Sequence, residues 1–341
     1  MSAEPGATPR RPRAARPRVG FLGVGWIGRH RMQAILETDA VDVVAIADAS
    51  PEAAAEAASL APGATKFPGL DGVLDFGVDG VVIATPSALH AEQSIRALQR
   101  GVAVFCQKPL GRTEAEVRAV VDAARAADRL LAVDLSYRFT EAMGGIRELV
   151  HSGELGRVYA VDLVFHNAYG PDKAWFYDPA LAGGGCVMDL GVHLVDLALW
   201  VLDFPAVSEV SAKLFAGGEP LKSRADQVED YAIASLELET GTSVRLACSW
   251  RLQAGRDAII SAAFYGTGGG ACLRNVNGSF YDFAAERYRG TASETLSTPP
   301  DAWGGRAAAD WAVRLSAGEH FSPEAERMVA VARVLDRIYG R

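Results

Sequence analysis

Val19-Gly20-Phe21-Leu22-Gly23-Val24-Gly25-Trp26-Ile27-Gly28 is the stretch of this 341-residue sequence that decides the fold. A short apolar run ends in G-x-G-x-x-G, and Asp48 follows Gly28 by 20 residues, at the end of the next apolar run. A strand, a glycine turn, a helix and an acidic residue, in this order, are typical of a dinucleotide-binding unit. The glycines would allow a tight turn, close approach of a pyrophosphate, and close packing of helix on strand. We therefore expect the cofactor to be bound by Gly23, Gly25, Trp26, Ile27 and Gly28.

Asp48 indicates which dinucleotide is bound. A carboxylate at this position can accept hydrogen bonds from a ribose hydroxyl, and it would repel a 2′-phosphate. Ala49 and Ser50 offer no compensating cation. The sequence therefore favours NAD(H) over NADP(H), against the alternative of a glycine-rich turn that binds nothing.

The chain around this motif alternates short apolar runs with helical stretches. Continuous apolar runs indicate strands covered on both faces, and strand–helix alternation indicates a parallel, doubly wound sheet. Residues 18–135 are thus predicted to form a Rossmann domain, preceded by a disordered basic tail at residues 1–17. The expected strands are Val19–Gly23, Val41–Ala47, Val81–Thr85, Val102–Cys106 and Leu130–Asp134, and the expected helices are Arg29–Glu37, Pro51–Leu60, Ala88–Arg100 and Thr113–Ala127.

The pattern changes after Ser136, where long strand-like stretches dominate. Strands in series with short glycine turns predict a large, mostly antiparallel open sheet, so residues 136–341 should form a second, α/β domain for substrate that ends in a helix. The expected strands are Val158–Asn167, Val207–Phe215, Tyr231–Glu239, Ser243–Arg251, Ala258–Tyr265 and Gly270–Val276. The expected helices are Glu141–Ser152, Val187–Leu202, Ala308–Ser316 and Pro323–Tyr339.

Composition argues against several classes of protein. The net charge of −8 disfavours nucleic acid or anionic lipid as a partner, and no run approaches the length of a membrane helix. No apolar stretch separates the arginines between Arg10 and Arg18 from the first expected strand, and no cleavage site follows them, so they do not indicate an export or transit signal. Four cysteines match no zinc spacing, which predicts reduced thiols and a cytoplasmic location.

Two further blocks lie where open α/β sheets bind ligands, at the carboxyl ends of predicted strands. In the first, Thr85 and Pro86 should face the nucleotide, and so should His90, unless it is a structural histidine at the start of a helix. In the second, Gln107 and Lys108 should lie near the cofactor ring. The Lys108 ammonium could hydrogen-bond a substrate hydroxyl there, the alternative being an ordinary surface lysine.

The block from Gly183 to Asp196 supplies a carboxylate and an imidazole. Three glycines lead into a helix on which Asp189 and His193 are four residues apart and share a face. A carboxylate one turn away can orient an imidazole, so His193 could take a proton from an alcohol while hydride leaves the carbon. The pair could instead bind metal or be structural, but no complete ligand set accompanies it, and we predict no metal site.

Taken together, these blocks make the chain resemble the glucose–fructose oxidoreductase/inositol dehydrogenase (Gfo/Idh/MocA) family from about Arg18 to its C-terminus. The resemblance also rests on Lys108-Pro109 and on the Ser152–Gly156 turn. It implies hydride transfer on a sugar, a cyclitol such as inositol, or a related polyol, with Lys108, Asp189 and His193 as the catalytic residues. It also implies that the substrate pocket contains Arg138, His166, Asn167 and Trp175. One departure is Gln107, which cannot supply the negative charge that the family's usual Glu places beside the lysine.

We therefore expect an NAD(H)-dependent oxidoreductase acting on CH–OH groups. Two alternatives are a ketoreductase for a nucleotide-linked sugar and a non-catalytic regulator that senses NAD. We also expect a homodimer or homotetramer, because Val158–Asn167 is apolar on both faces apart from Asp162 and the strand ends. The resemblance implies the same assembly, and the alternative is that loops of the same chain cover the sheet.

Overall fold

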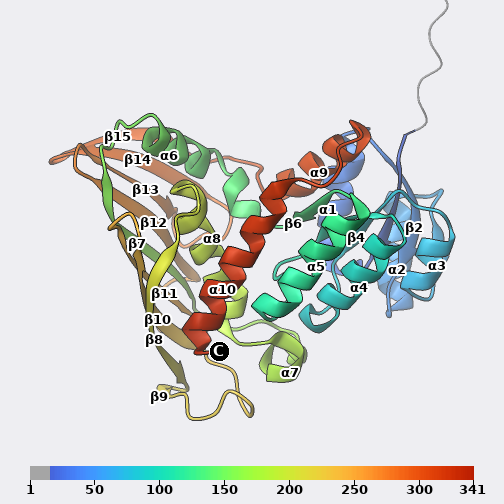
Figure 1. Ribbon diagram of the computed structural model, residues 1–341, viewed down its shortest axis with the longest axis horizontal. Coiled ribbons are helices and arrows are strands. Elements are labelled where there is room, and N and C mark those ends of the chain that lie inside the picture. The colour runs from blue at the N-terminus through green and yellow to red at the C-terminus, as the bar shows by residue number, and fades with distance from the viewer. Residues whose placement is uncertain (1–15) are drawn as a thin grey trace, which may run out of the picture.

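The computed structural model describes residues 16–341, which form two sheets with helices packed against them (Figure 1). The predicted basic tail lies outside the described residues except for its last two. Those two are ordered against the first sheet, since Arg16 pairs with Asp39 and the carbonyl of Pro17 accepts a hydrogen bond from the Asp42 amide.

The first sheet is the predicted doubly wound parallel sheet. Its strand order is β3-β2-β1-β4-β5-β6, and every neighbouring pair is parallel. Five of its strands were expected. β3 was not, because it is a short, largely exposed edge strand without an apolar run. The strands are β1 (Arg18–Leu22), β2 (Asp42–Ala47), β3 (Thr65–Phe67), β4 (Gly80–Ile83), β5 (Ala103–Cys106) and β6 (Leu131–Val133).

Helices cover this sheet, and their ends follow the local sequence. Thr113 caps α5 by accepting a hydrogen bond from the Glu116 amide at 3.2 Å, but the Glu116 carboxylate turns to Arg112 instead of completing a capping box. Gly101, at φ +75°, follows the end of α4. The helices are α1 (Trp26–Glu37), α2 (Pro51–Leu60), α3 (Leu70–Asp75), which was not predicted, α4 (Ser87–Gln99) and α5 (Glu114–Ala127).

The second sheet has nine strands in the order β15-β14-β13-β12-β7-β11-β10-β8-β9, and only β7 and β11 pair in parallel. β14 and β15 were missed because their sequences are polar and β15 is an exposed edge. The strands are β7 (Val158–Asn167), β8 (Val207–Ala216), β9 (Glu219–Pro220), β10 (Tyr231–Leu238), β11 (Ser243–Ser249), β12 (Ala258–Gly266), β13 (Gly270–Asn275), β14 (Phe283–Arg289) and β15 (Ala292–Ser297).

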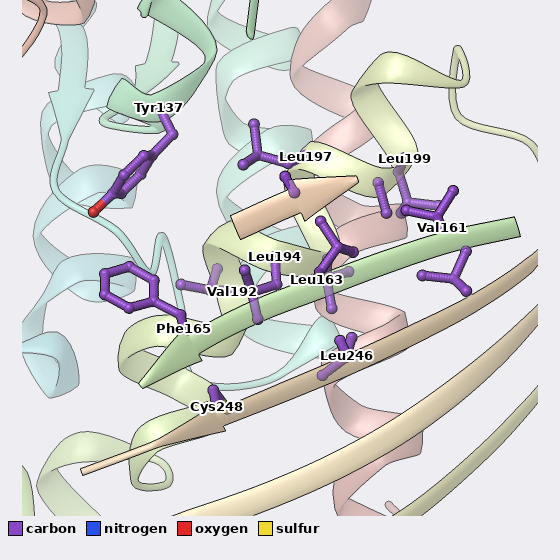
Figure 2. Packing of buried hydrophobic residues seen from close by; sticks show 14 of the residues in the cluster. Tyr137, Val161, Leu163, Phe165, Val192, Leu194, Leu197, Leu199, Leu246 and Cys248 are labelled. Atoms are coloured by element: carbon purple, nitrogen blue, oxygen red, sulfur yellow. The ribbon is translucent and has the colours of Figure 1, made fainter. Parts of the chain in front are cut away.

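One face of this sheet carries the helices. Figure 1 shows α6 (Glu141–His151), α8 (Val192–Val201) and α10 (Arg327–Tyr339) on the same side. In the core, Val161, Leu163 and Phe165 of β7 face Val192 and Leu194 of α8 (Figure 2). Shorter turns complete the domain at Ser136–Phe139, Ala174–Tyr177, α7 (Pro179–Ala182), the π turn Val187–Gly191 and Pro323–Glu326.

The segment Pro179–Val201 corrects one expectation. Its 23 residues are long and apolar enough to cross a membrane, although no such run was expected. They lie in the middle of the second domain, where 89% of the apolar window is buried inside the protein. The segment is therefore accounted for as a core helix.

The C-terminal helices return to the first sheet. Trp311 of α9 (Arg306–Ser316) is fully buried and lies 5.9 Å from the ring of Phe105 on β5. Val329 and Ala332 of α10 belong to the core on the other face of that sheet. The segment predicted to belong to the second domain therefore completes both faces of the Rossmann core.

Candidate active site

The glycine loop after β1 leaves room for a pyrophosphate. Gly23 has φ +83°, and a Cβ on it would lie 2.5 Å from the Ala84 carbonyl oxygen. A Cβ on Gly28 would collide with the Gly23 carbonyl, whereas one on Gly25 would meet nothing within 4 Å. No side chain caps the N-terminus of α1, so its amides are available to an anion.

Asp48 supports this loop from the end of β2. Its carboxylate accepts hydrogen bonds from the amides of Val24 at 2.6 Å and Ser50 at 2.8 Å. The acid is thereby held beside the glycine loop, where an acceptor for ribose hydroxyls is needed. The open space at Gly25, the uncapped helix and this acceptor together fit a dinucleotide.

The Thr85–His90 block divides into two parts. Thr85 and Pro86 lie at the carboxyl end of β4, and the Thr85 hydroxyl is 2.6 Å from Gln93 Oε1. His90 is 1% exposed, with its ring nitrogens each 2.7 Å from a carbonyl oxygen, those of Thr85 and Pro109. It joins two loops instead of facing open space, which agrees with the alternative that His90 is a structural histidine at the start of a helix.

Lys108 and Asp189 are joined across the two domains. Lys108 Nζ donates to Asp189 Oδ1 at 2.6 Å and to the Asp189 carbonyl at 2.8 Å. The indole Nε1 of Trp250 donates to Asp189 Oδ2 at 3.1 Å. Both side chains of the ion pair keep about a fifth of their surface exposed, at 20% and 17%, so the ammonium remains reachable.

His193 lies close by but is not oriented by Asp189, which corrects that expectation. Both carboxylate oxygens of Asp189 are engaged by Lys108 and Trp250. Asp189 lies in the π turn that precedes α8, the helix that carries His193. The imidazole packs instead against the Tyr137 ring, with centroids 4.8 Å apart.

The surroundings of His193 favour its neutral form. Burial lowers the pKa of His193 well below its usual value, and the positive charges of Lys108 and Arg31 lower it further. A neutral imidazole beside an ammonium group can accept a proton from a hydroxyl that the ammonium holds.

A cavity of about 730 Å³ opens onto these groups. Lys108, Gln107 and His193 line it together with Trp26 and Ile27 of α1. Four aromatic side chains that the sequence did not single out also line it, namely Tyr137, Phe280, Tyr281 and Trp303. The cavity therefore combines acid–base groups with aromatic walls, an arrangement suited to a small ligand.

Gln107 belongs to a buried charge network that the sequence did not reveal. Its amide donates to the carboxylate of Asp134, and Arg31 Nε donates to the same oxygen at 2.6 Å. Asp134 is 1% exposed and Arg31 6% exposed, and Asp134 Oδ1 is buried without a hydrogen-bond partner. The negative charge that Gln107 lacks is therefore present on Asp134, directly after the neighbouring strand β6.

The predicted substrate residues Arg138, His166, Asn167 and Trp175 all lie outside the cavity lining. Arg138 forms a bidentate ion pair with the buried Asp196, which corrects its predicted placement. His166 bonds Ser249 at 2.7 Å and stacks on Tyr231. Trp175 stacks on Phe176 at 3.8 Å. Each of these three side chains has a partner within the second domain.

Asn167 also lies outside the cavity lining, but it differs from the other three in its hydrogen bonding. It ends β7 with its side-chain oxygen buried and unpartnered.

Within residues 16–341 no cluster of three or more potential metal ligands occurs, and the absence of a metal from the site stays a prediction.

Comparison with known families divides the chain in the same way as the two sheets. Residues 17–135 match the oxidoreductase family with an NAD-binding Rossmann fold, and residues 144–272 match the GFO/IDH/MocA C-terminal domain.

Curated relatives are similar over part of their length. D-glucoside 3-dehydrogenase of Escherichia coli (strain K12) is 32% identical over 57% of this chain and 58% of the relative. Inositol 2-dehydrogenase of Rhizobium meliloti (strain 1021) is 29% identical over 81% of this chain and 78% of the relative. The chain thus matches little more than half the length of the first of these.

A solved structure extends the similarity to the whole chain. GenD2 from gentamicin A biosynthesis, in complex with NAD, superposes with a TM-score of 0.80 and is 26% identical. The superposition covers 98% of this chain and 96% of the other. The arrangement of Rossmann domain and open sheet is therefore shared along the full length.

Proposed function

The chain belongs to the Gfo/Idh/MocA oxidoreductase family, and we propose that it moves hydride to or from a hydroxyl-bearing carbon of a sugar, cyclitol or related polyol. The observation that carries the proposal is that Lys108 and His193 line one cavity, with Asp189 paired to Lys108 at 2.6 Å. Lys108 comes from the Rossmann domain and the other two from the second domain, so the reactive groups lie where a cofactor and a substrate would meet.

The proposed chemistry separates proton transfer from hydride transfer. Bound NAD supplies the hydride acceptor or donor. In the oxidising direction, the Lys108 ammonium donates a hydrogen bond to the substrate oxygen and orients the hydroxyl toward His193. The neutral His193 accepts the hydroxyl proton, while Asp189 holds Lys108 in place. In the reducing direction the same groups return the proton to the carbonyl oxygen.

The aromatic walls support a sugar-like substrate. The apolar faces of a pyranose or cyclitol ring can lie against side chains such as Trp303 and Tyr281, while its hydroxyls bond polar groups. The indole Nε1 of Trp303 donates to the Tyr281 carbonyl at 2.9 Å, which ties the two aromatic residues together. Among the predicted substrate residues, Asn167 keeps a buried side-chain oxygen without a partner, but it lies outside the cavity lining.

We infer that the working protein is a homo-oligomer in the cytoplasm that pairs through the second sheet. Within residues 16–341 no helix lies on the sheet face opposite α6, α8 and α10 (Figure 1). A row of small or apolar side chains crosses that face, formed by Ile233, Ala247, Val164 and Ser261 on four adjacent strands. Val158, at the start of β7, is instead buried with the inner core, although strand alternation puts it on the same face as Val164.

An absorbance assay tests the proposed activity. Purified protein, NAD(H) and a panel of inositols, free sugars, glycosides and nucleotide-linked sugars should give a change at 340 nm with at least one polyol. Activity confined to nucleotide-linked keto sugars would favour the ketoreductase alternative. NADH binding without turnover across a broad panel would favour the NAD-sensing regulator.

A further inference from the structure

Glu229 is a buried acid that the proposed chemistry leaves unused. It is 1% exposed and lies just before β10. Its carboxylate accepts hydrogen bonds from the Gly185 amide, 3.0 Å from both oxygens, and from the Val187 amide at 2.9 Å. The Tyr339 hydroxyl donates to it at 2.8 Å. Four contacts thus converge on one carboxylate in the interior.

The glycines at this point are required by close approach. A Cβ on Gly185 would collide with the Glu229 carbonyl oxygen, and one on Gly184 would collide with the Tyr339 hydroxyl. The Glu229 carbonyl also accepts the Cys186 amide at 3.0 Å. The glycine run thus lets the loop close on Glu229 and Tyr339, which lie 42 and 152 residues beyond the start of the π turn at Val187.

The hydrogen-bond donors around Glu229 favour a carboxylate, against the larger effect of burial. Burial raises the pKa of Glu229, while the hydrogen bonds from Val187 and Tyr339 lower it. The acid also accepts the first amides of the segment that carries Asp189 and His193, where the helix dipole stabilises negative charge. An amide in place of the acid would turn its NH₂ group toward amides that need an acceptor.

We propose that Glu229 and Tyr339 are positioning residues that fix the π turn and thereby hold Asp189 against Lys108. Asp189 lies two residues after Val187, whose amide Glu229 holds, so a shift of this amide moves the carboxylate that bonds Lys108 and Trp250. Because Tyr339 ends α10, the C-terminal helix is linked to the active site through one hydroxyl. This inference rests on the proposed roles of Lys108, Asp189 and His193.

Glu229→Gln tests the proposal in the full-length protein. We expect kcat to fall on the order of 10- to 100-fold, as for other small misplacements of reacting groups. The Kd for NADH, measured by fluorescence, should stay within about twofold, because the glycine loop and Asp48 are untouched. A structural defect alone would lower the amount of folded protein without separating kcat from Kd.

A second readout is independent of turnover. The indole N–H resonance of Trp250, assigned with Trp250→Phe, reports the bond to Asp189 and should move in Glu229→Gln. Tyr339→Phe should move the same resonance in the same direction by a smaller amount. This variant takes the place of Glu229→Gln as the test if Glu229→Gln does not fold. Thr242→Val is the matched control, because it removes a buried hydroxyl bond, to the Val158 carbonyl, at the far end of β11.

The outcomes separate the two proposals. If wild-type protein turns over no polyol, the proposed function fails, and the Trp250 resonance still decides whether Glu229 positions Asp189. If kcat and the Trp250 resonance in both variants equal those in Thr242→Val, the positioning role is overturned. A changed Trp250 resonance with unchanged kcat in an active enzyme would also overturn it, since Asp189 would then move without consequence.

Discussion

In the proposed mechanism the Lys108 ammonium orients the substrate hydroxyl, and the neutral His193 accepts its proton. Replacing His193 or Lys108 by Ala should each lower turnover by about 10²–10⁴-fold, the usual contribution of an acid–base group. NADH should still bind the His193→Ala protein, since the residue lies in the second domain and its loss leaves the glycine loop intact. Steady-state kinetics with the best substrate of the panel, with NADH titration as control, check this. Unchanged turnover in both variants would contradict the assignment.

The environment of His193 sets the direction of the pH dependence. Burial and the nearby charges of Lys108 and Arg31 destabilise the imidazolium, so the pKa of His193 lies well below 6.5. The base therefore stays unprotonated as the pH falls through 6.5, and kcat/KM for alcohol oxidation should decline only at more acidic pH. A pH–rate profile measures this, and an acidic limb centred at or above 6.5 would contradict it.

Asp48 should decide between the two nicotinamide cofactors. Its carboxylate sits where a 2′-phosphate would approach, so NAD(H) should bind more tightly than NADP(H) by calorimetry. Asp48→Ala combined with Ala49→Arg should erode the preference by removing a repulsion and adding a cation. Ala49→Arg alone is the control for the added charge, and tighter NADPH binding to the wild type would refute the expectation.

Sequence motifs identified the site residues whose positions depend on a nearby strand and the loop that follows it. Gly23, Asp48 and Lys108 follow strands in a recognisable sequence, and their positions could be predicted. Trp250 and Asp134 could not, because each meets its partner across at least 27 residues of chain and no periodic pattern marks it. The same applies to Arg138, whose partner Asp196 lies on a helix 58 residues away.

At the scale of elements, α9 supplies the layer that covers one face of the first sheet. Trp311→Ala should lower the free energy of unfolding by about 3–5 kcal/mol, because it empties a fully buried site against Phe105. Val313→Ala, on the same helix but 51% exposed, should cost far less. Chemical denaturation followed by circular dichroism compares them, and equal effects would show that α9 is not a core layer.

Elements with a continuous apolar run or a clear cap were predictable from sequence, and strands without such a run were not. α2 spans the expected Pro51–Leu60, with Ser50 accepting a hydrogen bond from the Ala53 amide. β3 and β15 are edge strands rich in exposed polar residues, and pairing with a neighbour, rather than their own pattern, makes them strands. The π turn at Val187–Gly191 also left no signal, because a helical apolar pattern tolerates one widened turn.

At the scale of the whole molecule, the open sheet face should join two copies. Light scattering should give a mass that is a multiple of 36.1 kDa at micromolar concentration. Ala247→Arg, in the central row of that face, should yield a folded monomer because a charge there would be buried without a partner. Ser59→Arg, on the exposed side of α2, carries the same charge change as a control. A wild-type monomer would show that the sheet needs no partner.

The return of α9 to the first sheet has a consequence for biosynthesis. The strands β1–β6 have been synthesised once residue 133 is added, but Trp311, which covers Phe105, is made after roughly 180 further residues. At about 5–20 residues per second, the nascent Rossmann sheet waits roughly 10 to 35 s with an apolar face uncovered. Newly made chains are therefore expected to depend on chaperones during this interval, which ends only when the last tenth of the polypeptide emerges.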